Sequence, residues 1–249
     1  MVLQNNTILI TGGSSGIGLE LAKRLIEKNN KVLICGRSEK KLEIAKKKHP
    51  EIEIFQCDLS KESECERLRH WIQEKQPECN VLINNAAIVH VADFYKDETI
   101  LEKANAEIHA NILAPIILSK LFIPIIEKNT NPKIINITSG LAYIPKADYP
   151  FYSATKAALH SFTQTLRMQM TKSAIDILEV FLPPVDTPFH KGNPPKKVIT
   201  AEKAVEGMIK GIEKGEIEIR VGITKLIYLM SRIAPNFALK KINSQVRVE

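Results

Sequence analysis

The sequence of 249 residues predicts a single α/β domain, residues 1–249, built on a doubly wound parallel sheet. Short β-rich runs alternate with helix-like segments through most of the chain. The first of these runs leads directly into a glycine-rich loop and then into a helical pattern. A chain of this length commonly forms one α/β unit, and no repeat, linker or low-complexity tract divides it.

Seven apolar or β-rich runs are predicted to be strands. Helical periodicity follows the first of them at 19–26, and longer helices are expected at 112–128 and 152–171. In the loop 183–200, prolines, Gly192 and three lysines interrupt regular structure, which predicts a flap over the substrate. Residues 223–249 are then a C-terminal extension. The expected strands lie at 7–11, 31–35, 52–57, 80–84, 133–137, 175–181 and 217–221.

The loop from Gly12 to Gly18 joins the first expected strand to the first helical pattern. Its glycines allow a tight turn and a close approach of the backbone to a ligand. The helix that follows would point its free amide groups at a pyrophosphate. A glycine-rich turn without a ligand is the alternative. The flanking strand and helix favour a dinucleotide site instead.

Tyr152 and Lys156 are four residues apart, so on a helix they lie on the same face. An ammonium beside a phenol would lower the phenol pKa from its usual ~10 toward neutrality. Ser139 adds a hydroxyl that could orient a substrate oxygen. A tyrosine and a lysine at this spacing also occur on ordinary helix surfaces. The other motifs of the chain must therefore decide whether this pair is catalytic.

These motifs together resemble the short-chain dehydrogenase/reductase family over roughly residues 5 to 220. The family's glycine pattern matches Thr11, Gly12, Gly16 and Gly18, and its Asn-Asn-Ala-Gly motif matches 84–87 with Ala87 in place of glycine. Its catalytic set falls in order and spacing on Asn111, Ser139, Tyr152 and Lys156. The resemblance implies a Rossmann-type sheet and an NAD(P)-dependent dehydrogenase or reductase.

The resemblance also implies roles for the catalytic residues. Hydride would move between nicotinamide and a carbonyl or alcohol substrate, with Tyr152 as general acid or base. Lys156 would lower the tyrosine pKa and hold the nicotinamide ribose. Ser139 would steady the reacting oxygen, and Asn111 would support a proton-relaying water. For Ser139 and Asn111 alone, a helix cap or a satisfied buried polar group is the other interpretation.

Arg37 indicates which dinucleotide is bound. It follows the second expected strand, where an acidic residue would favour NAD, and its planar donors suit a 2′-phosphate. NADP is therefore predicted, with NAD possible, because Arg37 could instead stack on adenine or point to solvent. By resemblance, Asp58 holds the adenine edge; a helix cap or a salt bridge is its other interpretation. The full predicted cofactor set is Gly12, Ser14, Ser15, Gly16, Ile17, Gly18, Arg37, Asp58, Leu59, Asn85, Ala86, Tyr152, Lys156, Val185 and Thr187.

One loop departs from the family pattern. The family usually continues its sixth strand with Pro-Gly-x-Val-x-Thr, whereas this chain has Pro183-Pro184-Val185 and then Thr187. Val185 and Thr187 can still face the nicotinamide, although the path of the loop is left open. Candidate pocket residues follow Ser139, lie around 90–94 and occur in the 183–200 loop, and they do not single out a substrate.

The composition limits the partners. The net charge of +7 is spread over helix faces and does not indicate nucleic acid. The four cysteines and six histidines lack metal-ligand spacing, so we expect reduced thiols and no metal. The first residues do not show the charged and then apolar pattern of a secretion signal, which favours a cytoplasmic location.

The apolar stretch 223–239 contains Lys225, Arg232 and Pro235, so it does not predict a membrane span. We expect it to pack over the substrate end of the sheet or at a subunit contact; attachment to a membrane surface is the alternative. Similar proteins pair through their long helices, which implies a homodimer or homotetramer.

Two other functions are compatible with parts of the pattern. An extended-type epimerase or dehydratase shares the Tyr and Lys pair but carries a different glycine motif and a substrate domain. A non-catalytic dinucleotide sensor would be expected to lose one of the four catalytic residues, all of which are present here.

Overall fold

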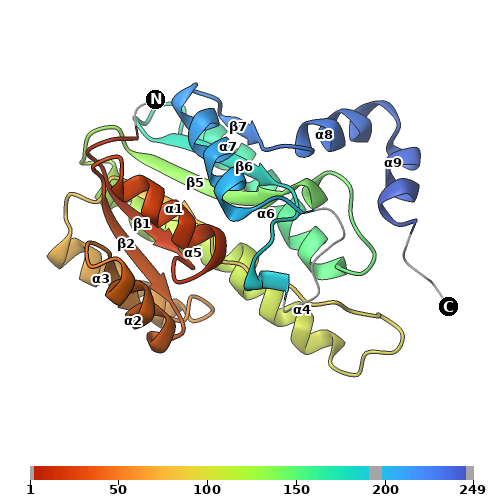
Figure 1. The fold of residues 1–249 in the computed structure, drawn as a ribbon, viewed down its shortest axis with the longest axis horizontal. Helices are drawn as coiled ribbons and strands as arrows, with labels where there is room; N and C mark the ends of the chain where they lie inside the picture. The colour runs from red at the N-terminus through yellow and green to blue at the C-terminus, as the bar shows by residue number, and fades with distance from the viewer. Residues whose placement is uncertain (1–2, 191–197, 245–249) are drawn as a thin grey trace.

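The computed structural model describes residues 3–190 and 198–244. Seven parallel strands form one sheet in the order β3-β2-β1-β4-β5-β6-β7 (Figure 1). The chain runs outward from β1 to β3, crosses back to β4 beside β1, and continues to β7, which confirms the doubly wound sheet. The strands are β1 (Thr7–Thr11), β2 (Lys31–Gly36), β3 (Glu53–Gln56), β4 (Val81–Asn84), β5 (Lys133–Ser139), β6 (Asp176–Leu182) and β7 (Glu218–Arg220).

Helices cover both faces of the sheet (Figure 1). One face carries α1 (Gly16–Ile26), α2 (Glu39–Lys48) and α7 (Ala201–Glu213). The other carries α3 (Glu62–Lys75), α5 (Ala114–Ile126) and α6 (Pro150–Gln169). α4 (Ile100–Ile108) runs into α5 through a π-helical turn, η1 (His109–Leu113). The other elements are the 3-10 turns η2 (Gly140–Ala142) and η3 (Pro188–His190), and the last helices α8 (Thr224–Ile233) and α9 (Pro235–Ile242).

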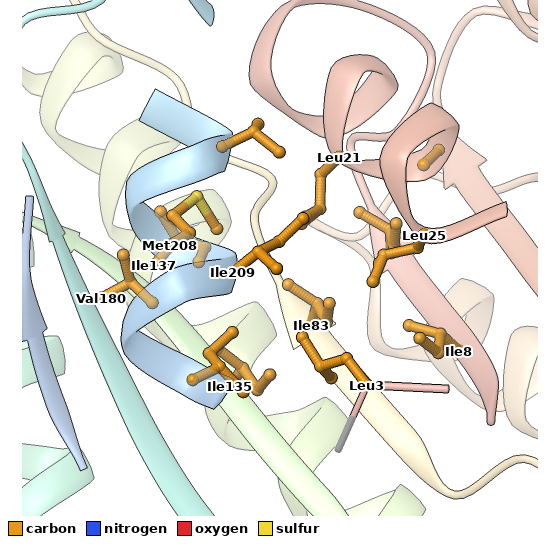
Figure 2. Packing of buried hydrophobic residues seen from close by; sticks show 14 of the residues in the cluster. Leu3, Ile8, Leu21, Leu25, Ile83, Ile135, Ile137, Val180, Met208 and Ile209 are labelled. Carbon is orange, nitrogen blue, oxygen red and sulfur yellow. The ribbon is translucent and has the colours of Figure 1, made fainter. Parts of the chain in front are cut away.

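The alternation of side chains along each strand feeds two hydrophobic cores. In β1, Ile8 and Ile10 pack in the core beneath α1 and α7, while Leu9 packs in the core beneath α3 and α5. Figure 2 shows the first core, where Leu21 and Leu25 of α1 and Met208 and Ile209 of α7 meet across the strands. Both faces of the central strands are buried, which explains why these strands are continuous apolar runs.

The four cysteines are free thiols, as expected, and all are buried in the core beneath α3 and α5. Burial raises the thiol pKa of Cys57 from 9.0 to about 12 and that of Cys65 to about 11. Burial raises the pKa of Cys35 and Cys79 as well. The thiols therefore behave as small apolar side chains of the core.

Within the described residues, one helical run, Ile100–Ile126, is long and apolar enough to cross a membrane by length and composition. It consists of α4, η1 and α5. Leu118 and Phe122 of α5 belong to the core beneath the sheet. A core helix passes the same test, so this is weak evidence for a span.

The 183–200 loop and the 223–239 stretch are the two segments expected beside the substrate. In the 183–200 loop, Asp186 N donates to Ile199 O at 2.9 Å and Ile199 N donates to Pro184 O at 3.1 Å, which ties its two ends together. Residues 191–197 of the expected flap lie outside the described residues. The 223–239 stretch forms α8 and most of α9, beyond the β7 edge of the sheet (Figure 1).

Candidate active site

A cavity of about 840 Å³ lies at the carboxyl ends of the strands. The ends of β1 and β4 meet there, at the point where the sheet reverses its winding direction, which is where open α/β sheets bind their ligands. Its walls come from the loops after β1, β2, β3, β4, β5 and β6, from α6, and from α8 and α9. One continuous cavity therefore joins the glycine loop to the tyrosine and lysine pair.

The glycine loop fits closely against the loop after β4. Gly12 has a φ of +65°, and a Cβ at this position would lie 2.9 Å from Ala86 Cα. A Cβ at Gly18 would lie 2.6 Å from Gly12 O. In the described structure Ser15, the N-cap of α1, makes no side-chain capping bond. The first residues of α1, Gly16, Ile17 and Gly18, line the cavity.

Thr11 links the glycine loop to the loop after β4. Its Oγ1 accepts hydrogen bonds from Asn85 N and Ala86 N, both at 2.9 Å, and donates to Ile83 O at 3.3 Å. The Asn85 side chain returns a hydrogen bond to Thr11 O at 2.9 Å. These bonds hold two cavity-lining loops in one arrangement.

Arg37 and Asp58 line the far end of the cavity, after β2 and β3. Burial raises the pKa of the Asp58 carboxyl, but hydrogen bonds from Ser60 and the charge of Arg37 outweigh it, so the net pKa lies below 3.8. Lys41, in the first turn of α2, lines the same end. Lys41 was not predicted from the sequence, where it is one of several lysines of a charged helix.

Tyr152 stands on the first turns of α6, and Ser139 ends β5 opposite it. Burial raises the pKa of the Tyr152 phenol above 10.0, and a hydrogen bond with the Ser139 side chain opposes this rise. The expectation of a lowered tyrosine pKa is therefore wrong for the chain on its own. The spacing of Tyr152 and Lys156 gives proximity but not burial, and burial dominates here.

Lys156 lies one turn along α6, with its Nζ 5.6 Å from the centroid of the Tyr152 ring. Its Nζ donates a hydrogen bond to Ile137 O at 2.8 Å. Burial lowers the pKa of Lys156 to about 8, while the carboxylates of Glu179 and Glu107 act to raise it. The ammonium is thus held beside the phenol by the backbone of β5.

Asn111 lies in the π turn η1, behind the cavity lining that the described residues form. Its Oδ1 accepts from Ile88 N at 2.8 Å, and its Nδ2 donates to Ile88 O at 2.9 Å and to Thr155 Oγ1 at 3.2 Å. Asn111 therefore braces the loop after β4 against α6. A π turn inside a helix is frequent at functional sites.

Two buried carboxylates near Lys156 were not found from the sequence. Glu107 of α4 accepts hydrogen bonds from His90 N at 2.7 Å and pairs with His90 Nδ1 at 3.0 Å. Glu179 of β6 pairs with His160 Nδ1 at 2.9 Å, and burial raises its pKa. Glu179 carried a signal, since it is an acid in the middle of an apolar run, between Leu178 and Val180. Glu107 looked like one more charged helix residue.

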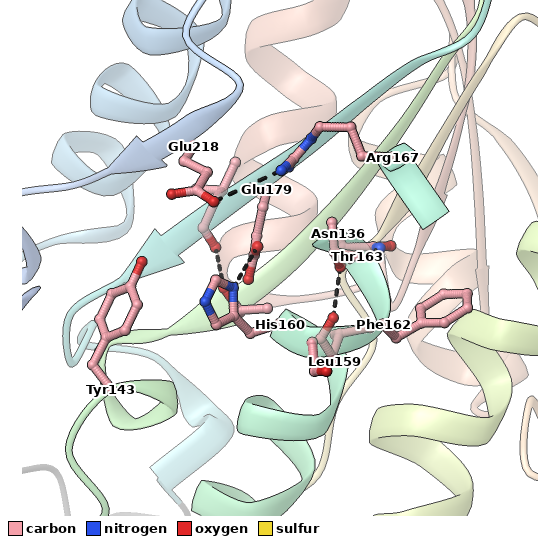
Figure 3. Close-up of polar contacts among 12 residues, drawn as sticks. Asn136, Tyr143, Leu159, His160, Phe162, Thr163, Arg167, Glu179 and Glu218 are labelled. Atoms are coloured by element: carbon pink, nitrogen blue, oxygen red, sulfur yellow. Dashed lines mark hydrogen bonds and ion pairs between the residues drawn. The ribbon is translucent and has the colours of Figure 1, made fainter. Parts of the chain in front are cut away.

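Figure 3 shows that His160, Glu179 and Glu218 converge beneath α6, with Arg167 reaching Glu218. Their potential ligand atoms lie within 4.8 Å of one another, close enough to consider a metal ion. Glu218, however, already pairs with Arg167, at 3.7 Å from Nη1, and with Arg220. The two guanidinium groups supply the positive charge, so we assign this cluster a structural role.

All fifteen predicted cofactor residues line the cavity, as do Ser139, Tyr152 and Lys156 of the catalytic set. Among the candidate pocket residues, His90 lines the cavity, whereas the Phe94 side chain is exposed at 75%. Phe189 of the expected substrate loop and Ile223 and Ile227 of the 223–239 stretch also line the cavity. Further lining residues that were not named from the sequence are Lys146, Tyr149 and Ile242. They come from segments without a motif, so only the folded chain brings them to the cavity.

A family model described as short chain dehydrogenase matches residues 6–197. The chain is 45% identical over 224 residues to the oxidoreductase DltE of Bacillus subtilis, covering 88% of this chain and 89% of that protein. It is 28% identical over 244 residues to a fatty acyl-CoA reductase of Acinetobacter baylyi, covering 94% of this chain and 82% of that protein.

Solved structures share the fold. A short chain dehydrogenase from Burkholderia cenocepacia, in complex with NADP, superposes with a TM-score of 0.86 at 22% identity and covers 97% of this chain and 99% of its own. A short chain dehydrogenase/reductase from Burkholderia phymatum, in complex with NAD, gives 0.83 at 15% identity and covers 100% and 99%. At these identities the likeness establishes the architecture.

Proposed function

The chain belongs to the short-chain dehydrogenase family and is an NAD(P)-dependent oxidoreductase of that family, and from this premise we propose that it reduces a carbonyl substrate with Tyr152 as the general acid. The observation that carries the proposal is the placement of Tyr152, Ser139 and Lys156 in the same cavity as the glycine loop. A bound nicotinamide dinucleotide would supply the hydride.

The residues present fit such a dinucleotide. The glycine loop leaves no room for side chains where the backbone turns, and the start of α1 lines the cavity, where its free amides would bind a pyrophosphate. Arg37 and Lys41, with the hydroxyl of Ser38, favour a 2′-phosphate at the far end and hence NADP, with NAD possible. Asp58 and Leu59 would flank the adenine, and Val185 and Thr187 the nicotinamide.

The raised pKa of Tyr152 suits the phenol to act as the acid in a reduction. A phenol that holds its proton at neutral pH can donate it to the substrate oxygen, because the acid form is the populated one. The Ser139 hydroxyl, already hydrogen-bonded to the phenol, would hold the same oxygen. The Lys156 ammonium, whose Nζ lies 5.6 Å from the Tyr152 ring centroid, would stabilise the phenolate left after the transfer.

The substrate end of the cavity supports a carbonyl compound with apolar substituents. Phe189 lies against Tyr152 with ring centroids 5.8 Å apart, and Ile223, Ile227 and Ile242 line the wall beyond. Lys146, Tyr149 and His90 are polar members of the same lining. The Acinetobacter baylyi relative, named a fatty acyl-CoA reductase, is in keeping with this class.

Consumption of NADPH with a panel of aliphatic, aromatic and sugar carbonyls tests the proposal. The parent protein should turn over at least one apolar ketone or aldehyde. Tyr152→Phe should lower kcat by about a thousandfold and leave NADPH affinity nearly unchanged, because it removes the proton and keeps the ring. Substantial turnover by Tyr152→Phe would contradict the role of the phenol, and NADPH binding without turnover of any carbonyl would support a sensor.

We also propose that the protein pairs through the α4, α5 and α6 surface. Leu101, Leu113 and Met168 of this surface and its connecting turn are exposed at 71%, 38% and 73%. Such an exposure of large apolar side chains would be costly in a monomer. Sedimentation of the free protein distinguishes a homodimer or homotetramer from a monomer, and a monomer would contradict this assembly.

A further inference from the structure

α8 presents its apolar side away from the rest of the protein. Leu226, Leu229 and Ile233, spaced three and four residues apart, form one stripe along the helix and are exposed at 54%, 50% and 70%. The opposite side, with Thr224 and Tyr228, packs on the fold. A surface helix normally turns its apolar stripe inward, so this orientation is the reverse of the usual one.

The inner side of α8 is firmly anchored, so the outward apolar stripe is not the result of a loosely held helix. Thr224 is fully buried, and its Oγ1 donates to Val221 O at 2.8 Å and to Phe181 O at 3.2 Å. The guanidinium of Arg220 stacks over the Tyr228 ring at 4.0 Å from the centroid. Turning the stripe inward would require all these contacts to break.

α9 is fixed in the same way. Asn243, just after it, accepts a hydrogen bond from Ala147 N at 2.7 Å and donates to Pro145 O at 3.1 Å. Phe237 and Leu239 of α9 are exposed at 61% and 42%. Ile223, before α8, adds a further exposed apolar side chain at 52%. The two helices therefore both expose apolar side chains, which we call the α8–α9 face (Ile223, Leu226, Leu229, Ile233, Phe237 and Leu239); the stripe of α8 is its continuous part.

The charges that α8 and α9 themselves carry are all of one sign. Lys225 and Arg232 lie along one side of the α8 stripe, and Lys240 and Lys241 lie on α9; all four are exposed. The sequence contains no aspartate or glutamate from Ile219 to Val248. A second copy of this chain is a poor partner, because a symmetric contact would bring these cations together without an acidic group to pair with them.

We propose that the α8–α9 face docks on the surface of an anionic lipid bilayer. An apolar stripe bordered by lysine and arginine is the pattern of a helix that lies in the membrane interface, with its apolar side among the acyl chains and its cations at the headgroups. The face borders the cavity, since Ile223 and Ile227 of this region line it. Docking would therefore bring the cavity mouth next to the bilayer without any segment crossing it.

Flotation with vesicles tests the proposal and does not depend on turnover. The parent protein should float with vesicles of phosphatidylcholine mixed with phosphatidylglycerol, float poorly with phosphatidylcholine alone, and lose binding as salt is added. Leu229→Ser combined with Ile233→Ser should weaken binding to the anionic vesicles by about tenfold or more. Lys225→Glu combined with Lys240→Glu should do the same by reversing two charges of this region.

Ile44→Ser is the matched control, because it removes an apolar side chain exposed at 47% from α2, outside both proposed contact surfaces, and should leave flotation unchanged. NADPH binding and thermal unfolding of both double variants check that they are folded; either variant alone can decide the question. Absence of flotation of the parent, equal binding to neutral and anionic vesicles, or parent-like flotation of the serine variant would overturn the proposal. So would an oligomer that the serine substitutions dissociate without lipid, since a second copy would then cover the face.

Discussion

The two ends of the cavity are built on different principles. At the cofactor end, the backbone sets the shape, because Gly12 and Gly18 bring main chains together at distances that a Cβ would not allow. At the substrate end, apolar side chains of α8 and α9 form the wall. Larger side chains in the glycine loop should therefore impair cofactor binding. Conservative substitutions among the apolar wall residues should change only which substrate fits.

Gly18→Ala should produce the largest effect on the cofactor end. Its Cβ would lie 2.6 Å from both Gly12 O and Asn85 Nδ2, so the loop must shift. We expect NADPH affinity to fall by about a hundredfold and the free energy of unfolding to fall by about 1–3 kcal/mol. Fluorescence titration with NADPH and urea unfolding measure the two quantities.

Gly215→Ala is the control for backbone strain alone. Gly215 has a φ of +76°, and among the described residues nothing lies within 4 Å of a Cβ there. This variant should lose about 1 kcal/mol of stability and keep the parent affinity for NADPH. Equal NADPH affinities in Gly18→Ala and the parent would show that the close approach is not required.

Lys156→Met tests the buried charge where the two ends meet. Since burial lowers the pKa of Lys156 from 10.5 to about 8, the folded protein binds fewer protons than the unfolded chain between these pH values. Lys156 thus makes stability rise with pH across this range, by about 3 kcal/mol in total. The variant should lack this contribution, while thiol ionisation is common to both proteins and cancels in the comparison.

Urea unfolding of Lys156→Met and of the parent at both ends of that pH range provides the measurement. Lys96→Met, which removes an exposed charge, is the matched control. Parallel stability profiles for the parent and Lys156→Met would mean that the ammonium is not destabilised by burial.

Arg37→Asp should have a smaller effect, limited to the choice of cofactor. We expect NADPH affinity to fall about tenfold and NADH affinity to rise, because a carboxylate repels a 2′-phosphate and accepts from a ribose hydroxyl. Lys40→Asp, the same change of charge outside the cavity lining of the described residues, should leave the preference unchanged. A parent protein that binds NADH as tightly as NADPH would rule out this function of Arg37.

Ile227→Val should have the smallest effect and should act on the substrate end alone. The loss of one methylene from the cavity wall should raise KM for an apolar ketone about fourfold, with NADPH affinity unchanged. Leu226→Val removes the same group from the outer side of α8 and serves as control. If both variants left KM unchanged in solution, Ile227 would not contact the substrate.

Much of the fold could be predicted because the central strands are short apolar runs that end in polar or glycine-containing loops. The expected strands at 7–11 and 133–137 correspond to β1 and β5, the latter extended to Ser139. The predicted cofactor residues converge because parallel strands place their carboxyl ends at one edge of the sheet. That convergence follows from topology and needs no knowledge of side-chain packing.

The remaining features depend on three-dimensional burial, which local sequence does not encode. The predicted direction of the Tyr152 pKa shift was wrong, because the spacing of the tyrosine and the lysine does not indicate how strongly the phenol is desolvated. Glu107 and its contact with His90 join residues 17 positions apart across a loop without a motif. The orientation of α8 was also not predicted, since an amphipathic pattern reveals two sides but not which of them faces the protein.

The distribution of the cysteines gives the molecule a built-in reporter of local opening. All four thiols lie in the core beneath α3 and α5, and the core beneath α1 and α7 contains none of them. An alkylating reagent reacts with thiolates, which burial keeps scarce, so labelling at neutral pH should proceed through conformations in which the α3 and α5 layer has lifted from the sheet. The rate of labelling by iodoacetamide would therefore report local opening of the α3 and α5 layer. Opening of the α1 and α7 layer would not be detected.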